Sequence, residues 1–247
     1  MDLIRPDWPA PAWVQAGCTT RAGGVSAGVY RGLNLGDHVG DAPERVARNR
    51  GLVRSALALP AEPLWLTQVH GCVVAEHGRA SPGCAADAVV GRRPGQVCAV
   101  LTADCLPLLL CDQRGRRVAA IHAGWRGLAA GVIEQSVAAL DVAPRTLLAW
   151  LGPAIGPDAF EIGDEVRAAL LAATPGLASA FRARPGGKWL ADLFALARAR
   201  LARAGVQQVF GGNDCTFSDP TRYYSFRRDG VTGRMASLIW LGAGAGA

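Results

Sequence analysis

A carboxylate and a thiol stand side by side in an otherwise apolar stretch, LTADCLPLLL (101–110), as Asp104 and Cys105. Free cysteine is often buried as a small apolar side chain, so Cys105 alone indicates only a core residue. Asp104 fits that interpretation badly, because an ionised carboxylate in apolar surroundings is costly unless it is paired or hydrogen-bonded. Pro107 also removes a backbone donor from any strand in this stretch. The stretch therefore predicts compensating partners from elsewhere in the chain.

Two of the four histidines end strand-like runs beside a glycine, His70 in TQVHG (67–71) and His122 in IHAGWRG (121–127). With Cys105 they form a set of metal-ligand types on three separate elements, each at an expected strand end. Two imidazoles and one thiolate suit zinc, with copper as a second metal, and leave a fourth position open to water. Zinc fingers and ribbons have paired ligands two to four residues apart, and this sequence has none, so three ordinary core residues remain the alternative.

A cysteine hydrolase is the rival use of the same residues. Cys105 would be the nucleophile and His122 its base, with Asp104 or Gln68 orienting the imidazole. A metal ligand and a nucleophile are not distinguished by the sequence alone, so both mechanisms stay open at this point.

A third feature follows His122, where small residues precede a helix that should begin near Trp125. The free amides of such a helix start, at Gly127 and beside Arg126, would suit phosphate or another anion. An ordinary tight turn is the alternative interpretation.

The composition narrows the class of protein. The chain has 247 residues, half of them apolar, and no linker-like stretch, which predicts one domain over 1–241 and a flexible Gly/Ala tail at 242–247. The net charge of +6 does not indicate a nucleic-acid partner, because the basic residues are spread along the chain, with Lys188 as the only lysine. Seven scattered cysteines without a C-x-x-C, no secretory h-region and no membrane-length apolar run predict a cytoplasmic protein with reduced thiols and no membrane partner. The oligomeric state is not indicated.

Strand-like runs alternate with fewer helical ones. We expect strands at 63–69, 86–90, 97–101, 106–111, 117–122, 146–151, 206–210 and 235–241. We expect helices at 42–59, with Asp41 as its cap, and at 125–140, 163–173 and 192–204. Back-to-back strands with a few helices predict a mixed-sheet α/β or α+β sandwich rather than a doubly wound parallel sheet.

A series of motifs then resembles one known family along nearly the whole chain. The motifs are TTRAGGVS (19–26), LNLGDHVGD (33–41), NR (49–50), TQVHG (67–71), TADC (102–105), HAGWRG (122–127), LGPAIGP (151–157), FEIG (160–163) and SFRRDGVTGRMASLIWL (225–241). They resemble the successive blocks of the YfiH family, once labelled multicopper polyphenol oxidase or laccase. The family includes purine nucleoside phosphorylase and adenosine deaminase enzymes and a peptidoglycan editing factor.

The resemblance implies a single α/β/β/α-type sandwich, related to the fold of toxins that use a Cys-His pair, with zinc held by His70, Cys105 and His122. It also implies a small-molecule pocket near Arg50 and the segment that contains Arg227. Our candidate substrate contacts are Arg50, Gln68, Asn34, Arg227 and Gly127, of which the two arginines and the glycine are candidates for phosphate. The chain departs from the family pattern at Gly32, where a serine is expected.

Several activities are compatible with this site. Multicopper oxidation is not, because a trinuclear cluster needs many more than four histidines and Met235 is the only internal methionine. Our first prediction is a zinc-dependent purine nucleoside phosphorylase with adenosine deaminase side activity, acting on a purine nucleoside and phosphate. The alternatives are an amidase that edits peptidoglycan precursors by removing L-Ser from UDP-MurNAc-L-Ser, and a cysteine hydrolase using Cys105 and His122. A pure binding module has no feature in its favour.

Overall fold

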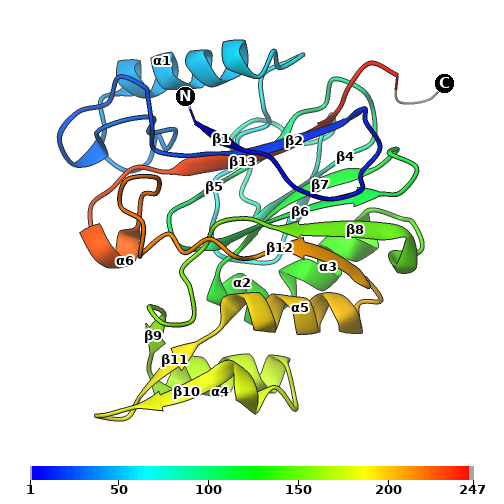
Figure 1. Cartoon of the computed structure of the whole chain (residues 1–247). Coiled ribbons are helices and arrows are strands. Elements are labelled where there is room, and N and C mark those ends of the chain that lie inside the picture. The colour runs from blue at the N-terminus through cyan, green and yellow to red at the C-terminus, as the bar shows by residue number, and fades with distance from the viewer. Residues whose placement is uncertain (1, 245–247) are drawn as a thin grey trace.

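Two β-sheets packed face to face form the centre of the computed structural model, which describes residues 2–244 (Figure 1). The first sheet is antiparallel and its strands follow the order β1 (Leu3–Ile4), β2 (Val14–Thr19), β13 (Met235–Leu241), β5 (Cys98–Thr102). The second sheet is mixed, in the order β12 (Gln208–Gly211), β8 (Leu147–Leu151), β6 (Leu106–Asp112), β7 (Val118–Ala123), β4 (Ala88–Gly91), β3 (Val74–Glu76). Its outer pairs β12/β8 and β3/β4 are parallel and its inner pairs antiparallel.

Helices cover both outer faces of this sandwich, so the layers are α/β/β/α (Figure 1). Helix α1 (Pro43–Ala56) covers the four-stranded sheet, and α2 (Trp125–Ala130), α3 (Val132–Ala139) and α5 (Leu193–Arg203) cover the six-stranded sheet. The fold class expected from the sequence is confirmed.

A smaller unit lies beside the helices of the six-stranded sheet (Figure 1). It consists of a three-stranded sheet, β10 (Phe181–Arg184), β11 (Lys188–Ala191) and β9 (Glu161–Ile162), with α4 (Asp164–Ala173) against it. Three short 3-10 helices, Gly28–Tyr30, Pro144–Thr146 and Ala178–Ala180, and the four-residue helix α6 (Phe226–Asp229) complete the elements.

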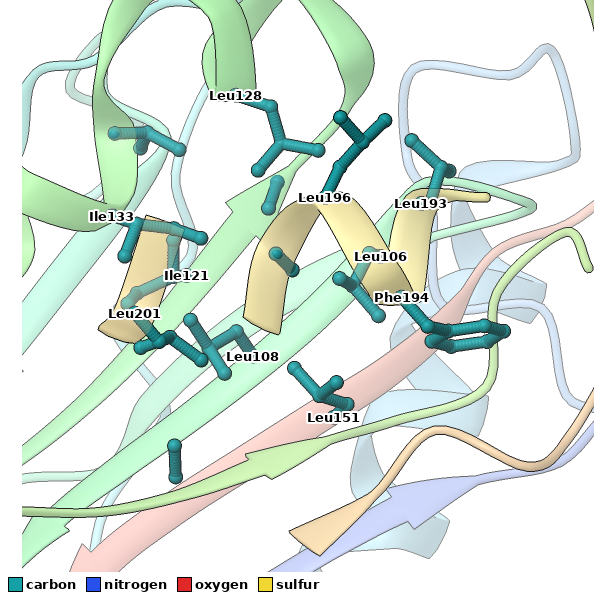
Figure 2. Packing of buried hydrophobic residues seen from close by; sticks show 14 of the residues in the cluster. Leu106, Leu108, Ile121, Leu128, Ile133, Leu151, Leu193, Phe194, Leu196 and Leu201 are labelled. Carbon is teal, nitrogen blue, oxygen red and sulfur yellow. The ribbon is translucent and has the colours of Figure 1, made fainter. Parts of the chain in front are cut away.

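Strand β6 shows why the layers form. All seven of its residues are buried, and alternate side chains point to opposite faces. Leu106, Leu108 and Leu110 pack against the helices, while Leu109 and Cys111 pack between the two sheets. Figure 2 shows the helix side of this core, where Leu106 and Leu108 meet Leu193, Leu196 and Leu201 of α5. A strand buried on both faces reads as a continuous apolar run, as the sequence does here.

Two expected elements differ in the structure. Residues 63–69 form only isolated bridges, Leu64 to Cys98 and Thr67 to Ala85, so the predicted strand is wrong. The helix expected at 125–140 is broken at Gly131, whose φ of 94° is left-handed and ends α2 before α3 begins.

Asp41 also differs from its expected role. The cap position of α1 is Ala42, without a side-chain cap, and the Asp41 carboxylate accepts hydrogen bonds from Ser26 and Asn34. The prediction of a mobile tail at 242–247 falls in part on residues 245–247, which lie outside the described residues. Gly242 donates its N–H to the Trp13 carbonyl at 2.7 Å.

The turn between β5 and β6 connects the two sheets, because β5 belongs to the four-stranded sheet and β6 to the six-stranded sheet. The chain crosses between the layers within three residues, 103–105, and Asp104 adopts a left-handed φ of 86° to do so. Cys105 therefore stands at the end of the sandwich, beside the end of β7 that carries His122.

Candidate metal centre and active site

The three ligand-type residues predicted from the sequence meet at this end of the sandwich. His70 comes from the irregular segment before β3, Cys105 from the crossing turn and His122 from β7. Their nitrogen and sulfur atoms all lie within 4.8 Å of one another, with His70 Nε2 3.9 Å from Cys105 Sγ. Gly124 permits this approach, because a Cβ there would lie 3.0 Å from Cys105 Sγ and 3.1 Å from His70 Cδ2.

Asp87 directly precedes β4 and hydrogen-bonds two of these residues, His70 and His122. It is not among the site residues predicted from the sequence. Its fully buried carboxylate accepts a hydrogen bond from His122 Nδ1 at 2.8 Å, which leaves Nε2 of that ring free. It also accepts the backbone N–H groups of His70 at 2.9 Å, Gly71 at 2.7 Å and Val69 at 3.3 Å. These bonds fix the His70 turn, where φ is 60°. A carboxylate bonded to the second nitrogen of a histidine is the usual support of a metal ligand.

The same groups perturb one another electrostatically. Burial alone would raise the pKa of the Cys105 thiol, but the adjacent His122 and hydrogen bonds with both histidines lower it to about 6. Burial alone would lower the pKa of His122, but the Cys105 thiolate and Asp87 raise it to about 9. At neutral pH the metal-free cluster thus contains a thiolate, the form of cysteine that binds metals and attacks electrophiles.

Asp104 has the partners that its buried position demands. Its carboxylate accepts hydrogen bonds from Thr216 Oγ1 at 2.6 Å, Ser225 Oγ at 2.9 Å and the N–H of Arg227 at 2.7 Å. The orienting role considered for Asp104 in a cysteine hydrolase is therefore wrong, since the carboxylate that contacts His122 is Asp87. Asp104 instead anchors helix α6 next to Cys105.

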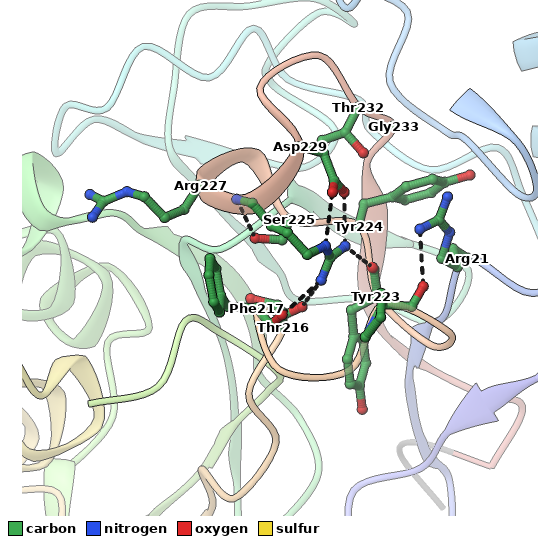
Figure 3. A network of polar contacts seen from close by, with 12 residues as sticks. Arg21, Thr216, Phe217, Tyr223, Tyr224, Ser225, Arg227, Asp229, Thr232 and Gly233 are labelled. Carbon is green, nitrogen blue, oxygen red and sulfur yellow. Dashed lines mark hydrogen bonds and ion pairs between the residues drawn. The ribbon is translucent and has the colours of Figure 1, made fainter. Parts of the chain in front are cut away.

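Arg228 anchors the same segment from the other side. It donates to the carbonyls of Thr216, Phe217 and Tyr223 and pairs with Asp229 at 2.8 Å. Figure 3 shows this network, with Arg227 pointing away from it. The neighbouring Phe226 is held on a rigid support while 59% of its surface stays exposed.

Two cavities adjoin at the ligand cluster, and His70, Cys105 and Phe226 line both of them. The first, of about 240 Å³, is mainly apolar and aromatic; the residues that give it this character are Trp125, Ile155, Phe160 and Leu193, with Arg126 and Arg227 also in its wall. The second, of about 260 Å³, is more polar and is lined also by His38, Gln68, Thr102, His122 and Arg234. Concave sites with aromatic walls and a few polar groups are typical small-molecule sites.

The other predicted contact residues mostly support this site from behind. Asn34 is fully buried, and its side-chain oxygen Oδ1 accepts the N–H of Arg234 at 2.9 Å. Both ends of the Gln68 amide bond the backbone of Leu101, each at 2.7 Å. Arg50 donates to the Leu35 carbonyl and lies outside the lining of both cavities.

Arg227 lines the first cavity and also donates to the Glu161 carbonyl at 2.7 Å. Gly127, in the first turn of α2, lies behind the His70 turn, since a Cβ there would come within 2.9 Å of the Gly71 carbonyl oxygen. Gly32 has a left-handed φ of 113°, and a Cβ there would lie 2.0 Å from the Arg21 carbonyl oxygen, so the local backbone excludes a serine.

The donor set fits a divalent metal of borderline softness. Two imidazoles and a low-pKa thiolate converge, and one imidazole is fixed by a carboxylate. The cluster faces cavities, and no fourth ligand joins it from residues 2–244. His70, Cys105 and His122 could therefore hold zinc with a coordination position left for a small molecule. Copper could bind the same atoms.

Comparison with known proteins identifies the family. A family model described as "Multi-copper polyphenol oxidoreductase laccase" matches residues 15–242. The chain belongs to this family. A Shigella flexneri relative, named purine nucleoside phosphorylase YfiH, is 52% identical over 240 residues, which cover 97% of this chain and 98% of the relative. A Pseudomonas aeruginosa relative, also named a purine nucleoside phosphorylase, is 54% identical over 242 residues, 96% of this chain and 98% of its own.

Solved structures agree with the sequence comparison. A Neisseria meningitidis crystal structure matches with a TM-score of 0.95 at 51% identity and covers 98% of this chain and 100% of its own. YlmD from Geobacillus stearothermophilus matches with a TM-score of 0.93 at 30% identity, over 98% of this chain and 97% of its own. The resemblance to the YfiH family is confirmed. Among residues 2–244, none of the helices is long and apolar enough to cross a membrane.

Proposed function

We propose that this family member is a metal-dependent purine nucleoside phosphorylase that holds one zinc ion through His70, Cys105 and His122. The names of relatives at 52% and 54% identity support the reaction. The observation that carries the proposal is the position of the ligand cluster between two adjoining cavities, one aromatic and one containing Arg234. A nucleoside and an anion could thus lie side by side next to the same three residues.

The residues of the first cavity would bind the purine. Trp125, Phe160 and Phe226 offer aromatic surface, and aromatic side chains bind planar bases by stacking. Arg126 and Arg227, also in the wall of this cavity, are positioned to bind ribose oxygens of the nucleoside. A bound divalent metal would supply a Lewis acid at the cluster and lower the pKa of a water molecule. Adenosine deamination is then the expected side activity, because an activated water could add to C6 of the base while its protons pass to the base and to the amino group, which leaves as ammonia.

Oxidation by several copper ions does not follow from the family description. In the part of the chain that the structure describes, His70, Cys105 and His122 form the one cluster of three or more potential ligands. A multicopper oxidase needs a trinuclear cluster in addition to a mononuclear site. We propose instead that any bound copper replaces zinc at this single cluster.

One observation favours a second candidate, a cysteine hydrolase. Cys105, His122 and Asp87 are arranged as nucleophile, base and orienting carboxylate, and the thiol pKa is about 6. Such a site could remove L-Ser from UDP-MurNAc-L-Ser, the editing reaction. Either reaction uses cytoplasmic metabolites, and we propose the cytoplasm as the location of the protein.

Product analysis separates these proposals. Zinc-loaded protein incubated with adenosine and phosphate should give adenine and ribose 1-phosphate at a rate that depends on phosphate, and inosine at a rate that does not. If neither product forms while the muramoyl-serine nucleotide is hydrolysed, the phosphorylase proposal is wrong.

Replacement of Cys105 by Ser distinguishes ligand from nucleophile. A lost ligand should reduce zinc content and phosphorolysis together, whereas a lost nucleophile would stop turnover with zinc content unchanged. Cys84→Ser is the matched control, because Cys84 is a half-buried free thiol outside the cluster. It should retain both zinc and activity.

A further inference from the structure

Arg234 is a half-buried cation next to the ligand cluster. It lines the second cavity together with Cys105 and His122. Its Nη1 donates to the carbonyls of Thr232 and Gly233, each at 3.0 Å. Within residues 2–244, Nε and Nη2 of Arg234 donate to no protein acceptor, and no carboxylate pairs with the guanidinium. The Nε and Nη2 donors of the Arg234 guanidinium therefore remain free at the cavity.

The surrounding chain holds this side chain in place. The backbone of Arg234 is bonded on both sides, by Asn34 Oδ1 at 2.9 Å and by the N–H of Leu35, which donates to its carbonyl at 3.1 Å. The aliphatic stem passes over Gly36, where a Cβ would come within 2.7 Å of Arg234 Cγ. The LNLG motif therefore positions an arginine from the other end of the chain.

Partial desolvation and free donors make this cation a strong site for an anion. Desolvation lowers the pKa of Arg234, yet a guanidinium stays charged at neutral pH. The nearby charges of Cys105 and Asp104 act in the opposite direction, and the two free donors of the planar guanidinium match the geometry of phosphate. Thr102, in the same cavity, has a buried hydroxyl without a hydrogen-bond partner among the described residues. The cavity thus contains a partly desolvated guanidinium with two free donors.

We propose that the cavity lined by Arg234 and Thr102 is the binding site of the inorganic phosphate that serves as second substrate. This inference rests on the proposed phosphorylase function. A phosphate oxygen would form a bond to C1′ of the ribose as the bond between C1′ and the purine nitrogen breaks. The purine takes the electron pair, and the proton of HPO₄²⁻ passes to it, so the products are the neutral base and ribose 1-phosphate. The purine then belongs in the first, aromatic cavity.

The arginines of the first cavity are less suited to this role. Arg227 already donates to the Glu161 carbonyl at 2.7 Å and is exposed. Arg126 stacks on Trp125, with its Cζ 4.4 Å from the ring centroid. Because water solvates these two side chains, they gain less than Arg234 from an anion.

Phosphate titration tests the assignment without any nucleoside present. By calorimetry on the zinc-loaded protein, Arg234→Gln should raise the phosphate Kd about tenfold or more, since it removes the charge and the fork. Arg234→Lys should recover part of this loss, because lysine restores the charge alone. Arg227→Gln, the matched control, should leave the phosphate Kd within about twofold of wild type. Steady-state kinetics should show the same pattern in the KM for phosphate, with the KM for nucleoside unchanged in Arg234→Gln.

The outcomes separate this inference from the proposed function. If Arg227→Gln weakens phosphate binding and Arg234→Gln does not, the assignment is overturned. If wild type binds phosphate through Arg234 but forms no ribose 1-phosphate, the site stands and the phosphorylase function fails. If Arg234→Gln does not fold, Arg234→Lys replaces it, because it keeps the charge and the aliphatic stem but removes the planar set of donors. An unchanged phosphate Kd in folded Arg234→Lys would then overturn the site.

Discussion

Asp87→Asn should weaken metal binding although Asp87 is not itself a ligand. The carboxylate fixes His122 through Nδ1 and the His70 turn through three backbone N–H groups. An asparagine has one acceptor oxygen, so it can serve only one of these two sides. If its NH₂ group faces His122, it donates to Nδ1 and moves the ring proton to Nε2, the atom needed by the metal. If the NH₂ group faces Gly71 instead, the turn that carries His70 loses its acceptor.

The expected losses of metal affinity and of stability in Asp87→Asn follow from these lost hydrogen bonds. Loss of a carboxylate that orients a metal ligand typically reduces metal affinity 10–100-fold, or about 1.4–2.8 kcal/mol. The metal-free protein should lose about 2–4 kcal/mol of unfolding free energy, because about two bonds to a charged acceptor disappear. Zinc affinity is measured by competition with a chelating dye, and stability by urea unfolding of chelated protein, so that metal binding does not contribute to the second value.

Asp112→Asn is the matched control. Asp112 is also a buried carboxylate that accepts two backbone N–H groups, those of Arg116 and Arg117 at 2.6 Å, but it lies at the far end of β6. It should lose a similar amount of stability and keep its zinc affinity within about twofold. Equal zinc affinities for Asp87→Asn and wild type, or equal losses of zinc affinity in both variants, would refute the role assigned to Asp87.

Three further results are expected. Zinc affinity should rise about tenfold per pH unit between pH 6 and 9, because zinc binding releases the proton of His122, whose pKa is about 9. Below pH 6 it should rise more steeply, because Cys105, with a pKa of about 6, must also lose a proton; a calorimetric affinity that does not change with pH would contradict this. Phe226→Ala should raise the nucleoside KM about tenfold with the unfolding midpoint unchanged, since the ring is exposed; an unchanged KM would exclude stacking. Gly127→Ala should destabilise the protein by about 1–3 kcal/mol in urea, although alanine favours helices, because its Cβ meets the Gly71 carbonyl; a stabilised variant would show that the turn can move.

The ligand cluster could be predicted from the sequence because its residue types are scarce and their positions are informative. With four histidines in the chain, two that follow strand-like runs beside glycine stand out, although the run before His70 is not a strand, and Cys105 is marked by the carboxylate before it. Asp87 could have been found by the argument applied to Asp104, since it also lies at the edge of an apolar run, ADAVV. A buried carboxylate in such a run needs partners, and here these are the histidines themselves.

Arg234 could not be recognised in the same way. It is one of 26 basic residues, and what distinguishes it is a tertiary contact with Asn34 and Gly36, far away in the sequence. The strand expected at 63–69 shows a different limit. Leu64 and Leu66 are buried, as alternation predicts, but Gln68 bonds the β5 backbone through its side chain where a strand would use its own amide.

Zinc content measured together with phosphorolysis tests the central claim most directly. Chelated protein is titrated with zinc, and elemental analysis and the rate of ribose 1-phosphate formation from adenosine are recorded on the same samples. The rate should rise in proportion to bound zinc and stop rising at about one zinc per chain, the capacity of the His70, Cys105 and His122 cluster. Full phosphorolysis by protein with less than about a tenth of an equivalent of metal would contradict the claim.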